Sequence, residues 1–292
     1  MIENPKITVI ITSSLIPSHP SIEVIKTTIE SLKFIGLKKG NSEVLIAQDN
    51  HPKRPKKRGP RYEIYKKRLQ EYFNKNPDFN YKILKGRPGG RIGLVGNVMN
   101  AFKSVKSEYV LVIQHDMPFL DKGIDINKIM EDMKSNPKMK HVRFNRRRNI
   151  ARGFDGENKN LFGNQIKANN YTYTSTGGWS DNNHICLASY YRNVVFPRCK
   201  PAGFMEKFLN GKHKGGSGHK ESNHIFGTYL YGPKGQNPVI WHKNGRKFLA
   251  KKKILKLDIH PYYILISHSS KNLINHILSY KLRDQITTLK QF

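Results

Sequence analysis

The sequence predicts an α/β fold in which a mostly parallel central sheet is flanked by helices. Short runs of β-branched and other apolar residues alternate along the chain with segments whose apolar residues recur at helical spacing. This alternation is typical of strands joined by helical crossovers. The most apolar run, Tyr109 to Ile113, is expected in the middle of the sheet because it does not suit an exposed edge. Several runs end in polar residues, at the positions where open α/β sheets bind ligands.

The amino-terminal part of the chain contains the clearest elements. The expected strands cover residues 6–12, 43–47, 79–84 and 109–116. The helices between them are indicated by apolar residues at three- and four-residue spacing, which begin at Ile22, Tyr62 and Val98. The first helix has Ser21 as a candidate cap and Gly36 near its end. Its two flanking strands should form a right-handed βαβ unit.

The later part of the chain is less regular. A helix is expected over residues 124–135, and residues 149–178, which are polar and rich in Gly and Asn, are predicted to be a long loop. Two strands and a short helix are then expected over 140–145, 183–191 and 204–209. Short apolar segments follow at 225–231 and 239–242.

At 292 residues the chain can bury a substantial core. We expect one domain over residues 1–250, divided into halves at 1–120 and 121–250, and a helical extension over residues 251–292. The apolar residues of the extension are flanked by Lys and Arg, so this helix would pack on the domain or lie on a membrane surface.

The chain carries a large positive charge, because 52 Lys and Arg against 21 Asp and Glu give a formal net charge of +31. Such a charge attracts nucleic acid, anionic membranes and phosphorylated small molecules. Nine Lys or Arg lie in the sixteen residues after Pro52, as a solvated charge run or a polyanion contact. The sequence shows no helix-turn-helix, zinc or RNP signature, so nucleic acid is the less favoured partner.

The cellular location is predicted from the two cysteines and the amino terminus. Cys186 and Cys199 lack metal-ligand or disulfide spacing and are expected to be reduced thiols. Residues 1–6 are polar, so we expect no signal peptide, and no window reaches the apolar length of a membrane span. We therefore expect a cytoplasmic protein, soluble or peripherally associated with an anionic membrane.

Candidate ligand-binding residues stand at the ends of two expected strands. These residues are Asp49, Gln114, His115 and Asp116. The glycine-rich segment 86–97 fits neither the dinucleotide fingerprint nor the Walker A pattern. Its glycines precede a helix and are flanked by Arg87 and Arg91, an arrangement that suits an anion.

Taken in this order, the segments resemble the GT-A type glycosyltransferases, most of all the family 2-like group. The resemblance covers about residues 6–245. It is carried by the strand 7–12 with its helix, the strand that ends in Asp49, the Gly93-x-x-Gly96-Asn97 helix that leads to Gln114-His115-Asp116, and Trp241-His242. It implies a Rossmann-like GT-A sheet, a nucleotide-binding first half and an acceptor-binding second half.

The resemblance also implies a nucleotide-sugar donor and a divalent cation. In the family the acid that ends the second strand binds the nucleobase, and Asp49 matches it. The last acid of an Asp-x-Asp motif binds the ion, and Asp116 matches it, whereas Gln114 replaces the first acid and lowers the negative charge of the site. His242 fits a histidine that completes the metal sphere, and mixed oxygen and nitrogen ligands suit Mn²⁺, with Mg²⁺ as the alternative. The donor is expected to contact Asp49, Arg91, Asn97, Gln114 and His115.

An inverting transfer, which the resemblance implies, needs a general base for the acceptor hydroxyl. Relatives carry an acid near a short helix after an acceptor-side strand, so Glu206 is the first candidate, with Asp181 and Glu221 next; each could instead be a solvated carboxylate. Residues 211–220 could close over the diphosphate as a lid or form an ordinary basic loop. Trp179 could stack on a sugar or pack in the core.

The leading hypothesis is a metal-dependent glycosyltransferase that moves a sugar from a nucleotide donor, with a UDP-sugar expected, to a hydroxyl of a glycan or similar acceptor. One alternative is a basic nucleic-acid-binding protein or nuclease, which the net charge of +31 favours. The other is a degenerate GT-A domain that binds a sugar nucleotide without turnover, which Gln114 favours.

Overall fold

The computed structural model describes residues 5–50, 59–86, 92–150, 164–176, 179–211 and 226–243. All of them belong to one unit of the chain, Met1–Leu249. Several expectations fall wholly or mostly outside the described residues. They concern the basic loop 51–58, Arg87 and Arg91, the lid at 211–220 from residue 212 onward, Glu221 and the extension 251–292. In the described part of the chain, no helix has the length and apolar character needed to cross a membrane.

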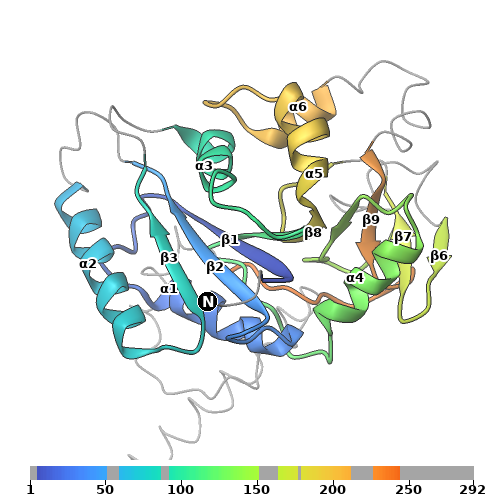
Figure 1. Cartoon of the computed structure of the whole chain (residues 1–292), viewed down its shortest axis with the longest axis horizontal. Helices are drawn as coiled ribbons and strands as arrows, with labels where there is room; N and C mark the ends of the chain where they lie inside the picture. The colour runs from blue at the N-terminus through green and yellow to red at the C-terminus, as the bar shows by residue number, and fades with distance from the viewer. Residues whose placement is uncertain are drawn as a thin grey trace, which may run out of the picture. The chain divides into compact units, whose positions relative to one another are not determined.

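The described strands form one nine-stranded sheet in the order β3-β2-β1-β4-β8-β5-β9-β7-β6, seen at the centre of Figure 1. Their bounds are β1 Ile7–Ser13, β2 Ser42–Gln48, β3 Asn80–Leu84, β4 Tyr109–Gln114, β5 His141–Arg143, β6 Gln165–Lys167, β7 Thr172–Ser175, β8 His184–Leu187 and β9 Thr228–Tyr231. Strands β3, β2, β1 and β4 are parallel neighbours, and so are β5 and β9, whereas β8 and β7 run against their neighbours. The prediction of a mostly parallel central sheet is confirmed.

The central position of β4 was predicted correctly, but its surroundings are parallel on one side only. β4 pairs with β1 in parallel and with β8 in antiparallel orientation. The next strand in the sequence, β5, is separated from β4 in the sheet by β8. β8, which comes late in the sequence, therefore lies between β4 and β5 in the sheet. The local apolar pattern of a strand does not predict which strand will pair with it.

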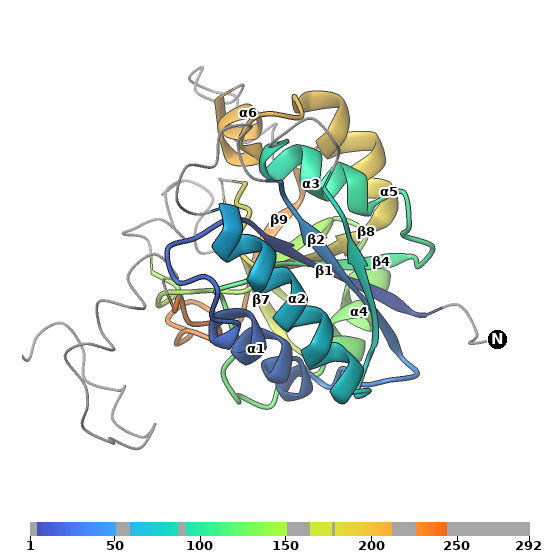
Figure 2. The same cartoon turned by 90° about the vertical axis from the view of Figure 1, so that its left-hand side faces the viewer.

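Helices cover both faces of the sheet. Their bounds are α1 Glu23–Glu30, η1 Ser31–Ile35, α2 Gly59–Lys75, α3 Gly93–Ala101, α4 Ile126–Ser135, α5 Ala188–Tyr190, η2 Tyr191–Val195, η3 Phe196–Arg198 and α6 Met205–Gly211. Val9 and Ile11 of β1 pack into one core with α1, α2 and α4, while Ile10 packs into a second core with α3, α5 and α6. Figure 2 shows β1 and β2 between these two groups of helices. Strands buried on both faces account for the continuous apolar runs in the sequence.

Three local predictions were only partly right. The helix expected from Ile22 divides into α1 and the 3₁₀ turn η1, and it ends at Gly36, whose φ of +77° favours glycine. Ile22 stands at the N-cap position of α1 without a side-chain cap bond, while the Ser21 hydroxyl one residue earlier accepts a hydrogen bond from the Glu23 N–H at 3.3 Å. The strand expected over residues 183–191 ends at Leu187, because the backbone turns helical from Ala188.

The loop predicted over residues 149–178 contains two strands, so that prediction was wrong in part. β6 and β7 form an antiparallel hairpin, and β7 joins the sheet by pairing with β9. The β6 residues Gln165 and Lys167 are exposed. Because β6 buries little apolar surface, the hydrophobic pattern that reveals other strands is missing here.

Candidate active site

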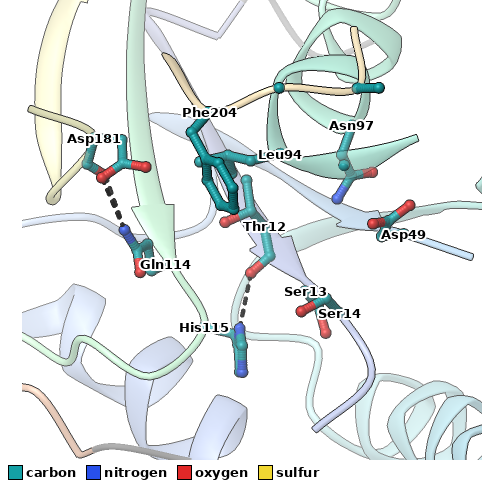
Figure 3. Close-up of a pocket in the computed structure, with 13 residues that line it drawn as sticks. Thr12, Ser13, Ser14, Asp49, Leu94, Asn97, Gln114, His115, Asp181 and Phe204 are labelled. Atoms are coloured by element: carbon teal, nitrogen blue, oxygen red, sulfur yellow. Dashed lines mark hydrogen bonds between the residues drawn. The ribbon is translucent and has the colours of Figure 1, made fainter. Parts of the chain in front are cut away.

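A pocket of about 400 Å³ lies at the carboxyl ends of β1, β2 and β4, and Figure 3 shows it in close-up. Its lining residues are Thr12, Ser13, Ser14, Asp49, Gly93, Leu94, Asn97, Gln114, His115, Asp181, Ala202, Gly203 and Phe204. Five sequence-predicted residues are therefore brought together, namely Asp49, Asn97, Gln114, His115 and Asp181. A cavity of this size is in the range that binds small molecules and cofactors.

The pocket lies where the order of the strands reverses, because β2 and β3 are added on one side of β1 and β4 on the other. β2 and β4 pair with opposite edges of β1. The crossover through α1 packs on one face of the sheet and the crossover through α3 packs on the other. The carboxyl ends of β1 and β4 thus meet at a topological switch point, which is where open α/β sheets bind ligands.

The end of the pocket near α3 is built around Asp49. Its buried carboxylate accepts hydrogen bonds from the main-chain N–H groups of Asn50 and Ile92, both at 2.9 Å through Oδ1. Asn97 on α3 donates its amide to the carbonyl oxygen of Ala47 at 2.6 Å. These bonds fix the amino end of α3 against β2, so the helix dipole is presented to the pocket.

Gln114 and His115 line the pocket but direct their side chains at protein groups. The Gln114 amide nitrogen lies 3.2 Å from the main-chain oxygen of Asp181 and 3.4 Å from its Oδ1, as the dashed line in Figure 3 marks. The His115 ring is buried, with Nδ1 3.1 Å from the carbonyl oxygen of Thr12. Both residues thus shape the wall of the pocket through contacts within the protein.

Asp116 and His242 are in direct contact, with 3.2 Å between Oδ2 and Nε2. Their side chains are 13% and 34% exposed, so a ligand can reach both. Main-chain hydrogen bonds connect residues 116–120 with 239–243: Leu120 to Val239 at 2.9 Å, Trp241 to Pro118 at 3.0 Å and Lys243 to Asp116 at 2.8 Å. This ladder sets His242 beside Asp116 across 126 positions of sequence.

The Asp116–His242 pair offers one oxygen-donor and one nitrogen-donor side chain, which fits the mixed ligation of Mn²⁺. Among the residues that the structure describes, no cluster of three or more His, Cys, Asp or Glu side chains could hold a metal ion. Two protein ligands leave most of the coordination sphere to oxygens from elsewhere, such as water or a diphosphate.

A second acidic pair lies on the other side of the pocket. Glu206 Oε1 on α6 accepts hydrogen bonds from the Ser180 hydroxyl at 2.6 Å and the Asp181 N–H at 3.1 Å. Burial and the nearby negative charge of Glu206 raise the pKa of Asp181 well above its usual range, and Arg143 opposes that shift. Asp181 lines the pocket whereas Glu206 does not. The arrangement makes Asp181 the pocket-facing carboxylate and places Glu206 behind it.

Two residues near the pocket carried no signal in the sequence analysis. Phe204 is 64% exposed although it lines the pocket, and Leu94 is a second apolar residue of the lining (Figure 3). Arg143 is buried in β5 and acts electrostatically on Asp181. Trp179 is buried against His141 and His184, so it packs in the core and does not stack on a sugar.

No family model matches the chain, and no curated protein matches it. Among solved structures, S. aureus TarS 1-349 in complex with UDP-GlcNAc is similar over 87% of this chain and 68% of its own, with 12% identity and a TM-score of 0.45. The mannosyltransferase PcManGT from Pyrobaculum calidifontis, in complex with GDP-Man and Mn²⁺, is similar over 65% of this chain and 46% of its own, with 12% identity and a TM-score of 0.43. A 4-diphosphocytidyl-2C-methyl-D-erythritol synthase from Anaerococcus prevotii is similar over 86% of this chain and 100% of its own, with 11% identity and a TM-score of 0.42.

The described residues form a mixed α/β fold around one sheet. Four parallel strands in the order β3-β2-β1-β4 are followed by the antiparallel strand β8, and helices cover both faces. The pocket lies at the carboxyl ends of β1, β2 and β4, where open α/β sheets bind ligands, and its volume suits a small molecule.

Proposed function

We propose that this protein is a glycosyltransferase that binds a nucleotide sugar in the β1–β4 pocket and transfers the sugar to a hydroxyl group, with a UDP-sugar as the expected donor. The observation that carries the proposal is the convergence of three chemical groups at one edge of the sheet. Asp49 lies at one end of the pocket and Asp181 at the other, and the Asp116–His242 pair directly follows the pocket-lining His115.

The donor is assigned to the pocket wall formed by the ends of β1 and β2 and the start of α3. Asp49 would accept hydrogen bonds from the nucleobase, as the resemblance implies. The amino terminus of α3 would face the diphosphate, because the helix dipole favours an anion there. Gly93 has a φ of +71° at the first turn of α3, so a side chain at this position would strain the turn.

Asp116 and His242 would hold the divalent cation. When bound, the cation supplies positive charge that stabilises the leaving nucleoside diphosphate. The protein's own part is to set the two ligands beside one another through the ladder between residues 116–120 and 239–243.

Asp181 is assigned as the general base that takes the proton from the acceptor hydroxyl. Its carboxylate lines the pocket, and a raised pKa makes it a stronger base than an ordinary aspartate. Glu206 was the first candidate from the sequence, but its bonds to Ser180 and to the Asp181 N–H favour a supporting role. Asp181 is therefore the first candidate for the base, and Glu206 the second.

The first test is calorimetric titration with UDP, UDP-GlcNAc, GDP and GDP-mannose, each with and without Mn²⁺. We expect one nucleotide to bind with Mn²⁺ dependence, and Asp116→Ala to weaken that binding by about tenfold or more. Asp121→Ala, at an exposed acid five residues later, is the matched control and should bind as the wild type does. Absence of binding to all four compounds would refute the proposal.

The second candidate function is a binder that holds the sugar nucleotide without turnover. Gln114 favours it, since an amide in place of the first motif acid lowers the charge available to a metal. Hydrolysis of the bound donor separates the two candidates. An enzyme should release the sugar slowly to water and lose this activity in Asp181→Asn, whereas a binder should release none.

A further inference from the structure

Gln114 occupies the position at which the GT-A resemblance expects a carboxylate. Its hydrogen bonds offer a physical reason for an amide at this position. The side-chain nitrogen reaches Oδ1 of Asp181 at 3.4 Å and the main-chain oxygen of Asp181 at 3.2 Å. The main-chain N–H of Gln114 donates to Oδ1 of Asn183 at 3.2 Å. Gln114 is thus bonded at two points to the segment that presents Asp181.

A carboxylate at position 114 would meet a site that is already acidic. Asp181 and Glu206 adjoin each other, and the charge of Glu206 already acts on Asp181. A third carboxylate within hydrogen-bond reach would repel both and would have no proton to donate to Asp181. An amide avoids this repulsion and supplies two N–H donors.

We infer that Gln114 is a positioning residue for Asp181 and not a ligand of the donor. Its amide holds the Asp181 carboxylate on the pocket side and favours the ionised form, which is the form that can accept a proton from the acceptor hydroxyl. The inference rests on the proposed function, in which Asp181 is the base.

The groups that face Asp181 come from several elements. Glu206 on α6 and Arg143 on β5 contribute opposite charges, and Tyr191 of η2 is near enough to interact electrostatically with it. Gln114 on β4 is the neutral donor in this set. A substitution at Gln114 therefore changes the hydrogen bonding of the Asp181 carboxyl group and leaves Glu206, Arg143 and Tyr191 in place.

The test compares Gln114→Leu, which removes the amide, with Gln114→Glu, which keeps the shape and adds a charge. Gln70→Glu is the matched control, because Gln70 is exposed on α2. Three quantities are measured for each variant: UDP affinity with Mn²⁺, the kcat and KM of hydrolysis of UDP-GlcNAc or GDP-mannose, and the Asp181 carboxyl titration followed by ¹³C NMR.

We expect Gln114→Leu to keep UDP affinity within about twofold, and both Gln114 variants to lose about tenfold or more in kcat. The acid limb of the kcat profile and the Asp181 titration should both move to higher pH, further in Gln114→Glu than in Gln114→Leu. The Gln70→Glu control should match the wild type in all three quantities.

Two results would overturn the inference. One is a loss of UDP affinity of about tenfold or more with kcat retained, which would make Gln114 a donor ligand. The other is an Asp181 titration that is the same in the wild type and in both variants. Failure of the proposed function looks different, because the wild type would then bind no nucleotide, while the NMR titration would still decide the role of Gln114.

Discussion

The buried carboxyl group of Asp181 should lower the stability of the folded protein at high pH, while the proposed function requires it as a base. Its folded-state pKa is raised by burial and by Glu206, so its contribution to stability is greatest when the carboxyl is protonated and is lost as pH rises through the folded pKa. We expect Asp181→Asn to raise the Tm by about 2–4 °C at pH 8, with a smaller gain at pH 5. Donor hydrolysis should fall by about 10²- to 10⁴-fold.

Calorimetric melting of wild type, Asp181→Asn and the exposed-acid control Asp78→Asn, at both pH values, tests this prediction. The control lies on the surface and should change little at either pH. A Tm gain that is the same at pH 5 and pH 8 would show that ionisation of Asp181 is not the cause.

His19 should make the fold sensitive to acid. Burial, with His115 and Arg61 nearby, lowers its pKa to about 3, and its ring stacks on Tyr65 with 3.9 Å between centroids. Between pH 6.5 and about 3 the unfolded chain binds a proton that the folded chain does not, so the stability present above pH 6.5 is lost as pH falls. The buried His184, with a pKa lowered to about 4, should act in the same direction.

We expect His19→Phe to flatten the decline of unfolding free energy between pH 7 and pH 4. Phenylalanine keeps the stack on Tyr65 but cannot titrate. At pH 7 the variant should be less stable by about 1 kcal/mol, because the N–H of Ile16 loses its acceptor on His19. Urea unfolding at several pH values measures both effects, and an unchanged slope would contradict the assignment.

At the scale of elements, helix α4 holds the β6–β7 hairpin through one buried side chain. The Asp132 carboxylate accepts hydrogen bonds from the Asn170 N–H at 2.9 Å, the Asn170 amide at 3.0 Å, the Tyr171 N–H at 3.0 Å and the Tyr173 hydroxyl at 2.8 Å. All four donors lie in the connection of the hairpin or in β7. The hairpin is therefore held both by packing of Tyr173 in the core and by hydrogen bonds to a helix.

We expect Asp132→Ala to destabilise the protein by about 3–5 kcal/mol, because it leaves four donors without their acceptor. Asp121→Ala, at a surface position, should change the unfolding free energy by about 0.5 kcal/mol or less. The urea midpoint of each variant measures the difference. An Asp132→Ala midpoint close to that of the control would mean that water replaces the carboxylate.

This anchor also explains why some elements could be predicted from the sequence and others could not. β1, β2 and β4 are buried on both faces, so their residues are apolar in unbroken runs that the sequence displays. The hairpin depends on a contact between Asp132 and residues 38 to 41 positions later. Local sequence patterns cannot predict a contact between residues this far apart in the chain.

The same distinction applies to the candidate site. Asp49, Gln114 and Asp116 could be placed because they lie at or just after the ends of strands, and parallel strands end at the same edge. The positions of Phe204 and Arg143 depend on how α6 and β5 pack, and that packing is decided by the whole fold. The bond from Gln114 to Asp181 was also hidden, since the two residues are 67 positions apart.

At the scale of the whole molecule, the net charge of +31 should produce weak binding to any polyanion. We expect the affinity for duplex DNA or heparin to be independent of sequence and to fall by about 10³-fold or more between 50 and 200 mM salt, as counterion release predicts. Binding of UDP with Mn²⁺ should change far less over that range. Fluorescence anisotropy with two unrelated DNA duplexes measures the first, and sequence-selective binding at 150 mM salt would favour the nucleic-acid alternative.

The ladder between residues 116–120 and 239–243 has a consequence for the order of folding. A contact across 126 positions closes a large loop, and contacts of this kind form late because the chain must lose much of its freedom first. The pairing of β1, β2 and β4 involves only the first 114 residues. The Asp49 end of the pocket can therefore form before Asp116 meets His242, so a growing chain would complete these two parts of the candidate site one after the other.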